Sequence, residues 1–77
     1  MTIQELRQTK DYAEAMSKIK KYPKDFTFKL NYSAIPKGKA NALRIIMQDC
    51  IDGGIIESVS IGVTLNGEQT DETFKRL

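Results

Sequence analysis

The chain has 77 residues, 40% of them hydrophobic and 29% charged, with a net charge of +2. This length predicts one domain, residues 1–77, because a second core could not be buried. One cysteine, Cys50, and no histidine exclude an internal disulfide and leave no zinc ligand set, so no metal or other cofactor is expected. No apolar run could cross a membrane. A lone cysteine is typical of a reducing compartment, and we expect a cytoplasmic protein.

Residues 2–21 predict a helical segment. Thr2 with Glu5 fits a capping box at its start, and Asp11 with Glu14 fits a second one. The segment is therefore expected to form either one helix or two that bend near Thr9. Pro23 prevents the helix from continuing.

A strand and a helix are predicted next. Apolar and polar residues alternate over residues 25–32, which is the pattern of a strand with one buried face. Residues 34–38 connect this strand to a helix over residues 39–52, whose apolar positions include Leu43, Ile46, Met47 and Cys50. Gly53-Gly54 is expected to end that helix.

A second strand is predicted over residues 55–65. Val59, Ile61, Val63 and Leu65 share one face, and polar residues share the other. Asn66-Gly67 predicts a turn. A final short helix is expected from Thr70, a good N-cap followed by two acidic residues.

The resulting order is α-β-α-β-α. This predicts an α/β protein of the two-layer α+β type, with a small two-stranded sheet packed on helices. The pattern allows parallel or antiparallel pairing, since the helix between the strands favours the first and the alternation favours the second. A two-stranded sheet is marginal and has two open edges, so pairing with a second copy would complete it.

Charge is unevenly distributed along the chain. Residues 1–39 carry nine basic and four acidic side chains, whereas residues 40–77 carry three basic and six acidic ones. A basic segment around Tyr22 and the lysines beside Gly38 could contact an anion or the phosphates of a nucleic acid. The candidate contacts are Lys18, Lys20, Lys21, Lys24, Lys37, Lys39, Asn41, Arg44 and Gln48.

Asn41, Arg44 and Gln48 lie on one face of the predicted helix 39–52 and have side chains that can read base edges. The following Gly54-Ile55-Ile56-Glu57 resembles the end of a winged helix, where the recognition helix leads into the wing. The resemblance covers about residues 39–65. It stops upstream, because a helix-turn-helix needs another helix where a strand is predicted here.

No catalytic residues are predicted. Cys50 lies on an apolar helical stripe, and the chain has no histidine to activate it. We therefore expect a small non-enzymatic interaction or regulatory module, homodimeric or bound to another protein through an open strand edge or the polar sheet face. The alternative is a small nucleic-acid-binding accessory protein that uses the basic N-terminal half and the start of the middle helix.

Overall fold

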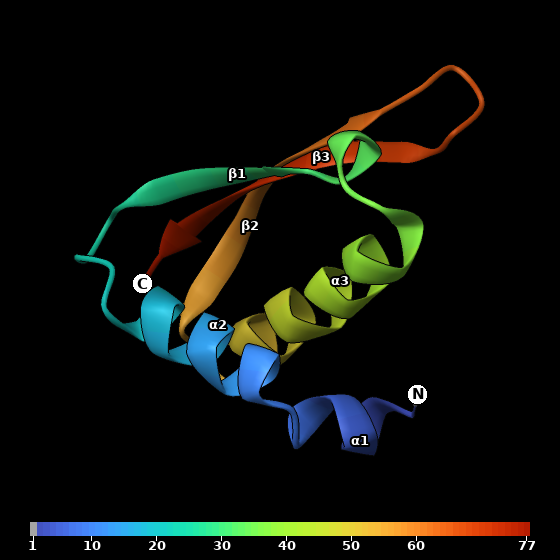
Figure 1. The fold of residues 1–77 in the computed structure, drawn as a ribbon. Coiled ribbons are helices and arrows are strands. Elements are labelled where there is room, and N and C mark those ends of the chain that lie inside the picture. The colour runs from blue at the N-terminus through green and yellow to red at the C-terminus, as the bar shows by residue number, and fades with distance from the viewer. Residues whose placement is uncertain (1) are drawn as a thin grey trace.

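The computed structural model describes residues 2–77 and shows a two-layer α+β arrangement, with helices on one face of a three-stranded sheet (Figure 1). The α+β class is as expected, but the order is α-α-β-α-β-β, with one turn of 3-10 helix, η1, after the first strand. The elements are α1 (Ile3–Arg7), α2 (Lys10–Lys20), β1 (Thr27–Asn31), η1 (Tyr32–Ala34), α3 (Lys37–Asp52), β2 (Ile56–Val63) and β3 (Gln69–Arg76).

The first helical segment divides into two helices, which is one of the two expected forms. Thr2 and Glu5 make the expected capping box at the start of α1. The cap of α2 is Thr9, whose side chain accepts a hydrogen bond from the Tyr12 amide. The expected second box of Asp11 with Glu14 was therefore wrong, because the hydroxyl of Thr9 already serves the free amides of the first turn.

The third strand corrects the sequence prediction most strongly. Residues 69–76, expected as a helix from Thr70, form β3 in the centre of the sheet, in the order β1-β3-β2. Residues 64–68 join β2 to β3. The Thr64 amide donates to the Glu68 carbonyl, which leaves Leu65, Asn66 and Gly67 as the turn, and Gly67 has a φ of +82°. This is a favoured hairpin geometry, and it outweighs the helix-start signal of Thr70.

Both pairings are antiparallel. Phe74 on β3 lies opposite Phe28 on β1 and opposite Ser58 on β2. β1 and β2 consequently run parallel to each other but are separated by β3, so the two-stranded sheet was wrong. The pairing direction, left open by the sequence, is decided by β3.

The core lies between the sheet and α2 and α3. Leu43 is partly buried against it, and the other expected apolar positions of the middle helix are buried. That helix begins at Lys37 rather than Lys39, and it ends at Gly53 as expected. The Phe28 and Phe74 rings stack at 5.4 Å between centroids. The buried cluster consists of Ile19, Ile46, Met47, Cys50, Ile56 and Phe74.

Arg76 ties the layers together at one end of the sheet. Its guanidinium donates hydrogen bonds to the carbonyl oxygens of Ile55, Leu77 and Lys20, at 3.1, 2.8 and 3.5 Å. One side chain on β3 therefore connects Ile55, the residue before β2, with Lys20, the last residue of α2.

Candidate functional site

The apolar residues of β2 are the most unusual surface of the molecule. Val59, Ile61 and Val63 are 55%, 56% and 63% exposed, and Leu65 in the following turn is fully exposed. The sequence pattern placed these four side chains on one apolar face, as a strand with one buried face requires. That interpretation was wrong, since only Ile56 of β2 is buried.

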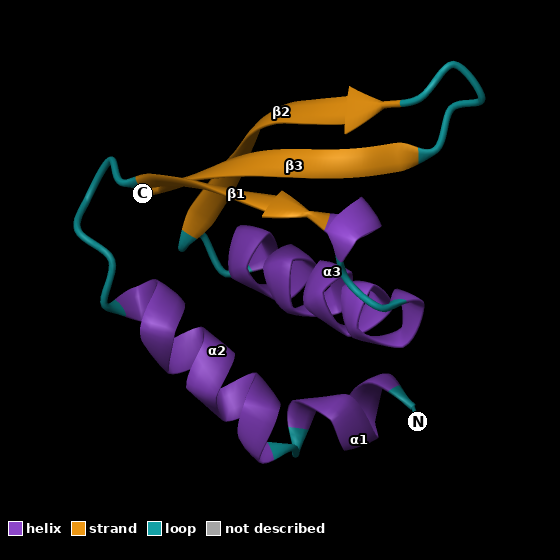
Figure 2. Ribbon diagram, turned by 45° about the horizontal axis from the view of Figure 1, so that its top comes forward, coloured by secondary structure: helices purple, strands orange, loops and turns teal. Residues whose placement is uncertain are grey.

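Two structural features cause this exposure. The register of β2 on β3 shifts between Ser58 and Ser60, so Val59 is an extra residue without a partner on β3. The hairpin then continues beyond α3, so the helical layer ends before the tip (Figure 2). Ile61 lies opposite Glu72, which in turn lies opposite Leu30, so Ile61 belongs to the helix-side face, yet it remains 56% exposed.

The main chain of β2 also has an open side. The Thr64 amide donates to the Glu68 carbonyl at 2.8 Å, toward β3. Successive residues of a strand turn their amide and carbonyl groups to alternate sides. Ile61 and Val63 therefore direct these groups to the free edge, where each can bond to another strand.

The part of β2 that follows Glu57 has no charged side chain that would discourage pairing with another strand. Residues 58–67 contain no charged side chain and no proline, and Glu57 and Glu68 flank the segment. Natural sheet edges are usually blunted by lysine, proline or a short strand. In β2 the bulge at Val59 serves that purpose, and a second register shift against β3 lies between Gly62 and Val63.

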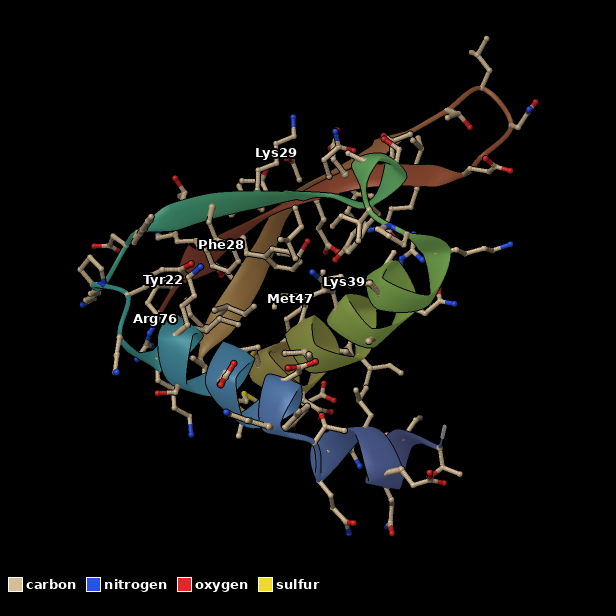
Figure 3. The ribbon with its side chains drawn as sticks, viewed as in Figure 1. Tyr22, Phe28, Lys29, Lys39, Met47 and Arg76 are labelled. Carbon is tan, nitrogen blue, oxygen red and sulfur yellow. The ribbon has the colours of Figure 1, made fainter. Side chains whose placement is uncertain are left out.

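The outer face of the sheet is polar, as expected. Figure 3 shows Lys29 pointing away from the helices, whereas Phe28 points between the layers. Lys29 lies 3.6 Å from Asp71 in an ion pair. The Asp71 carboxylate also covers Gly62, where a Cβ atom would collide with it.

The predicted basic contacts fall into two groups that lie on different elements. Lys18, Lys20, Lys21 and Lys24 lie at the end of α2 and in the loop after it. Lys37, Lys39, Asn41, Arg44 and Gln48 lie along α3. The structure does not bring the two groups into one continuous surface.

Three of the α3 side chains already have partners within the chain. Arg44 donates to Asn41 Oδ1 at 3.1 Å, and its guanidinium lies 4.5 Å from the centre of the Tyr32 ring. Gln48 donates to Asp52 at 2.9 Å. A base-reading role would require these contacts to open. The helix that a helix-turn-helix needs upstream is represented only by η1, a single turn.

Two hollows flank the start of α3. One, of about 390 Å³, lies between η1, the start of α3 and the residues just after the hairpin turn, and its lining includes Tyr32, Lys37, Arg44 and Glu68. Burial, reinforced by the charge of Glu72, raises the pKa of Tyr32 to about 12, and its hydroxyl has no hydrogen-bond partner. The other, of about 720 Å³, is mainly aliphatic and lies between the first two helices and α3.

Within residues 2–77 no group of three or more potential ligands could hold a metal ion. In the same range, no helix has the length and apolarity to cross a membrane. Burial is the main cause that raises the pKa of the Cys50 thiol, which keeps this side chain in its unreactive protonated form.

The exposed aliphatic edge was the feature that sequence reasoning missed. A signal for it exists in the uncharged run from Ser58 to Gly67, because a strand that is buried on one face usually shows charges on the other. Comparison with protein-family models, with curated proteins and with solved structures finds no match for this chain.

Proposed function

We propose that the protein is a small non-enzymatic interaction module, and that its binding surface is the open edge of β2. The observation that carries this proposal is the combination of free edge groups with the exposed side chains of Val59, Ile61 and Val63 on one uncharged segment. An extended segment of a partner would add a strand there. Main-chain hydrogen bonds would supply affinity, and the aliphatic side chains would supply apolar contact.

The choice of β2 over β1 rests on length and charge. β2 has eight residues, and β1 has five with Lys29 among them. A longer edge offers more hydrogen bonds, and the uncharged segment of β2 that follows Glu57 costs less to desolvate than a charged edge. The proposed compartment is the cytoplasm, on the ground that the single cysteine is free and buried.

Amide hydrogen exchange of the full chain tests the proposal, with a peptide of alternating threonine and valine, capped by lysines, as the strand probe. The Ile61 and Val63 amides, which face the open edge, should exchange at least about tenfold more slowly with peptide bound. The matched control is the β1 edge. At that edge the Phe26 carbonyl accepts a hydrogen bond from the main-chain amide of Arg76 on β3. The alternation along β1 therefore directs the amide and carbonyl groups of Thr27 and Lys29 to the open side. Equal protection of both edges, or of neither, would contradict the proposal.

A second candidate is a nucleic-acid-binding accessory protein. It is supported by the exposed lysines at the start of α3, where the N-cap Pro36 provides no side-chain hydrogen bond to the first-turn amides. The ion pairs of residues 2–77 do not involve Lys37, Lys39 or Arg44. Glu68 lines the hollow of about 390 Å³ together with Lys37 and Arg44, and its negative charge would repel phosphates, which weakens this candidate.

Fluorescence anisotropy with a short labelled DNA duplex, at about 50 mM and about 200 mM salt, tests the second candidate. Binding should fall steeply with salt and should weaken in Lys39→Glu. Lys75→Glu is the control, since Lys75 lies near the end of β3, away from the start of α3. No binding at the lower salt concentration would remove this candidate.

A further inference from the structure

We infer that the strand which pairs with β2 is the β2 strand of a second copy, running antiparallel about a two-fold axis at Ile61. This inference rests on the proposed function of the β2 edge and names its partner. The pairing would join two three-stranded sheets into one sheet of six strands, with both helical layers on the same face.

Charge selects the antiparallel direction. A parallel, in-register pair would place the two Glu57 side chains next to each other, and like charges directly opposite destabilise a sheet. In the antiparallel pair about Ile61, each Glu57 instead approaches the partner's turn at Leu65. The two Glu57 residues are then separated by about 25 Å, at about 3.3 Å per residue.

The position of the axis follows from the edge groups. In an antiparallel pair of two identical strands, the two-fold axis lies between the two copies of one residue. These copies can bond to each other only if the amide and carbonyl of that residue face outward. Ile61 and Val63 meet this condition. Val63 is the last residue of β2, and the Gly67 amide already bonds to the Thr64 carbonyl in the turn beyond it. Ile61 therefore is the outward residue with strand on both sides.

The side chains agree with a second copy as the occupant. Within residues 2–77 six large hydrophobic residues are exposed, and four of them lie in the seven residues from Val59 to Leu65. Under the two-fold axis Ile61 meets the partner's Ile61, and Val63 meets the partner's residues at the bulge near Val59. Each copy thus places its exposed aliphatic side chains beside those of the other along the shared edge. Since the hairpin extends beyond α3, the two helical layers remain apart (Figures 1 and 2).

Charge complementation at residue 61 gives the decisive test, because a residue on the axis faces its own copy. Sedimentation of the full chain should show a dimer for the wild type. Ile61→Lys and Ile61→Glu should each weaken self-association at least about 100-fold. An equimolar mixture of the two variants should restore the dimer, since lysine then faces glutamate. Thr27→Lys on the edge of β1 is the control and should remain dimeric.

Two spin-label distances check the direction of the strands, in a Cys50→Ala background. Labels at Glu57→Cys should lie about 25 Å apart, and labels at Asn66→Cys about 30 Å apart, because the tips point in opposite directions. Circular dichroism confirms that each variant is folded.

Three results would overturn the inference: a monomeric wild type at about 1 mM, a mixture of the two charge variants that stays monomeric, or tip labels closer than about 20 Å. A monomeric wild type whose Ile61 and Val63 amides are protected by the Thr-Val peptide would overturn only the second copy as partner. A monomer without that protection would overturn the proposed function as well.

Discussion

The two edges of the sheet differ in how they avoid unwanted pairing. The β1 edge is short, carries Lys29, and follows a loop in which Tyr22 and Phe26 stack at 4.7 Å between ring centroids. The β2 edge is longer and has no charge between Ser58 and Gly67. Since both edges belong to the same sheet and both pair with β3, the contrast shows that two edges of one fold can differ in the features that limit unwanted pairing.

The largest expected effect comes from a substitution in β3, the central strand with which both edge strands pair. Phe74 is fully buried on the central strand and stacks on Phe28. Phe74→Ala should lower the free energy of unfolding by about 3–5 kcal/mol, through lost burial and the cavity that remains. Urea denaturation measures this loss. Thr73→Ala, on the outer face of the same strand, should cost less than about 1 kcal/mol, and a similar loss in both variants would contradict the packing described.

A smaller effect should be confined to the β2 edge. Gly67 has a positive φ, and an alanine there should cost about 1–2 kcal/mol. Faster amide exchange at Gly62 and Thr64, whose amides face β3, with β1 unchanged, would locate the effect in the hairpin. The control is Gly38→Ala in α3, where an added Cβ meets no atom within 4 Å. This control should be neutral or stabilising by up to about 1 kcal/mol.

Acid should loosen α1 while leaving both sheet edges intact. Arg7 donates two hydrogen bonds to Asp49 at 2.9 and 2.8 Å, and the Tyr12 hydroxyl donates a third at 2.7 Å. The Arg7 bonds, followed by the Tyr12 bond, hold the pKa of Asp49 below its usual 3.8. A carboxyl with a lowered folded pKa stabilises the fold above its unfolded pKa.

The Asp49 contribution should therefore be complete above about pH 5 and should decline as the pH falls through 3.8 toward the lower folded pKa. Thermal unfolding between pH 2 and pH 6 measures it. Asp49→Asn should show a shallower decline over the same range, with the amide exchange of β2 unchanged. An identical pH profile for the wild type and Asp49→Asn would contradict this prediction.

The smallest effect should come from the charge on β1. The Lys29 side chain is 61% exposed, and its ion pair with Asp71 should contribute little. Lys29→Ala should change the free energy of unfolding by less than about 0.5 kcal/mol. If β1 then begins to associate in sedimentation experiments, the lysine is what keeps that edge closed. If association is unchanged, the short length of β1 is sufficient.

Much of the fold was predictable because its signals are local. The Thr2 cap, the alternation around Phe28 and the helical stripe ending at Cys50 each depend on residues close in sequence. β3 was missed because Thr70-Asp71-Glu72 is a good helix start by itself, and its strand form depends on pairing with β1 and β2. Local propensity cannot represent that distant pairing.

The candidate site was predictable only in part. Open strand edges and their importance followed from the small number of strands. The exposure of Ile61 and Val63 could not be predicted in the same way. Alternation of apolar and polar residues predicts that the apolar face of a strand is buried. The bulge at Val59 and the length of the hairpin beyond α3 are tertiary features, and they decide which apolar residues are covered.

The central position of β3 has a consequence for synthesis. β1 and β2 come earlier in the chain, yet neither can pair until residues 69–76 have left the ribosome. Before that moment the nascent chain presents the uncharged segment of β2 with both of its sides open. β2 therefore has two exposed edges during translation and one in the finished protein, and strand edges that are transiently exposed favour aggregation. Pairing with β3 across the turn at Leu65, Asn66 and Gly67 removes one of the two.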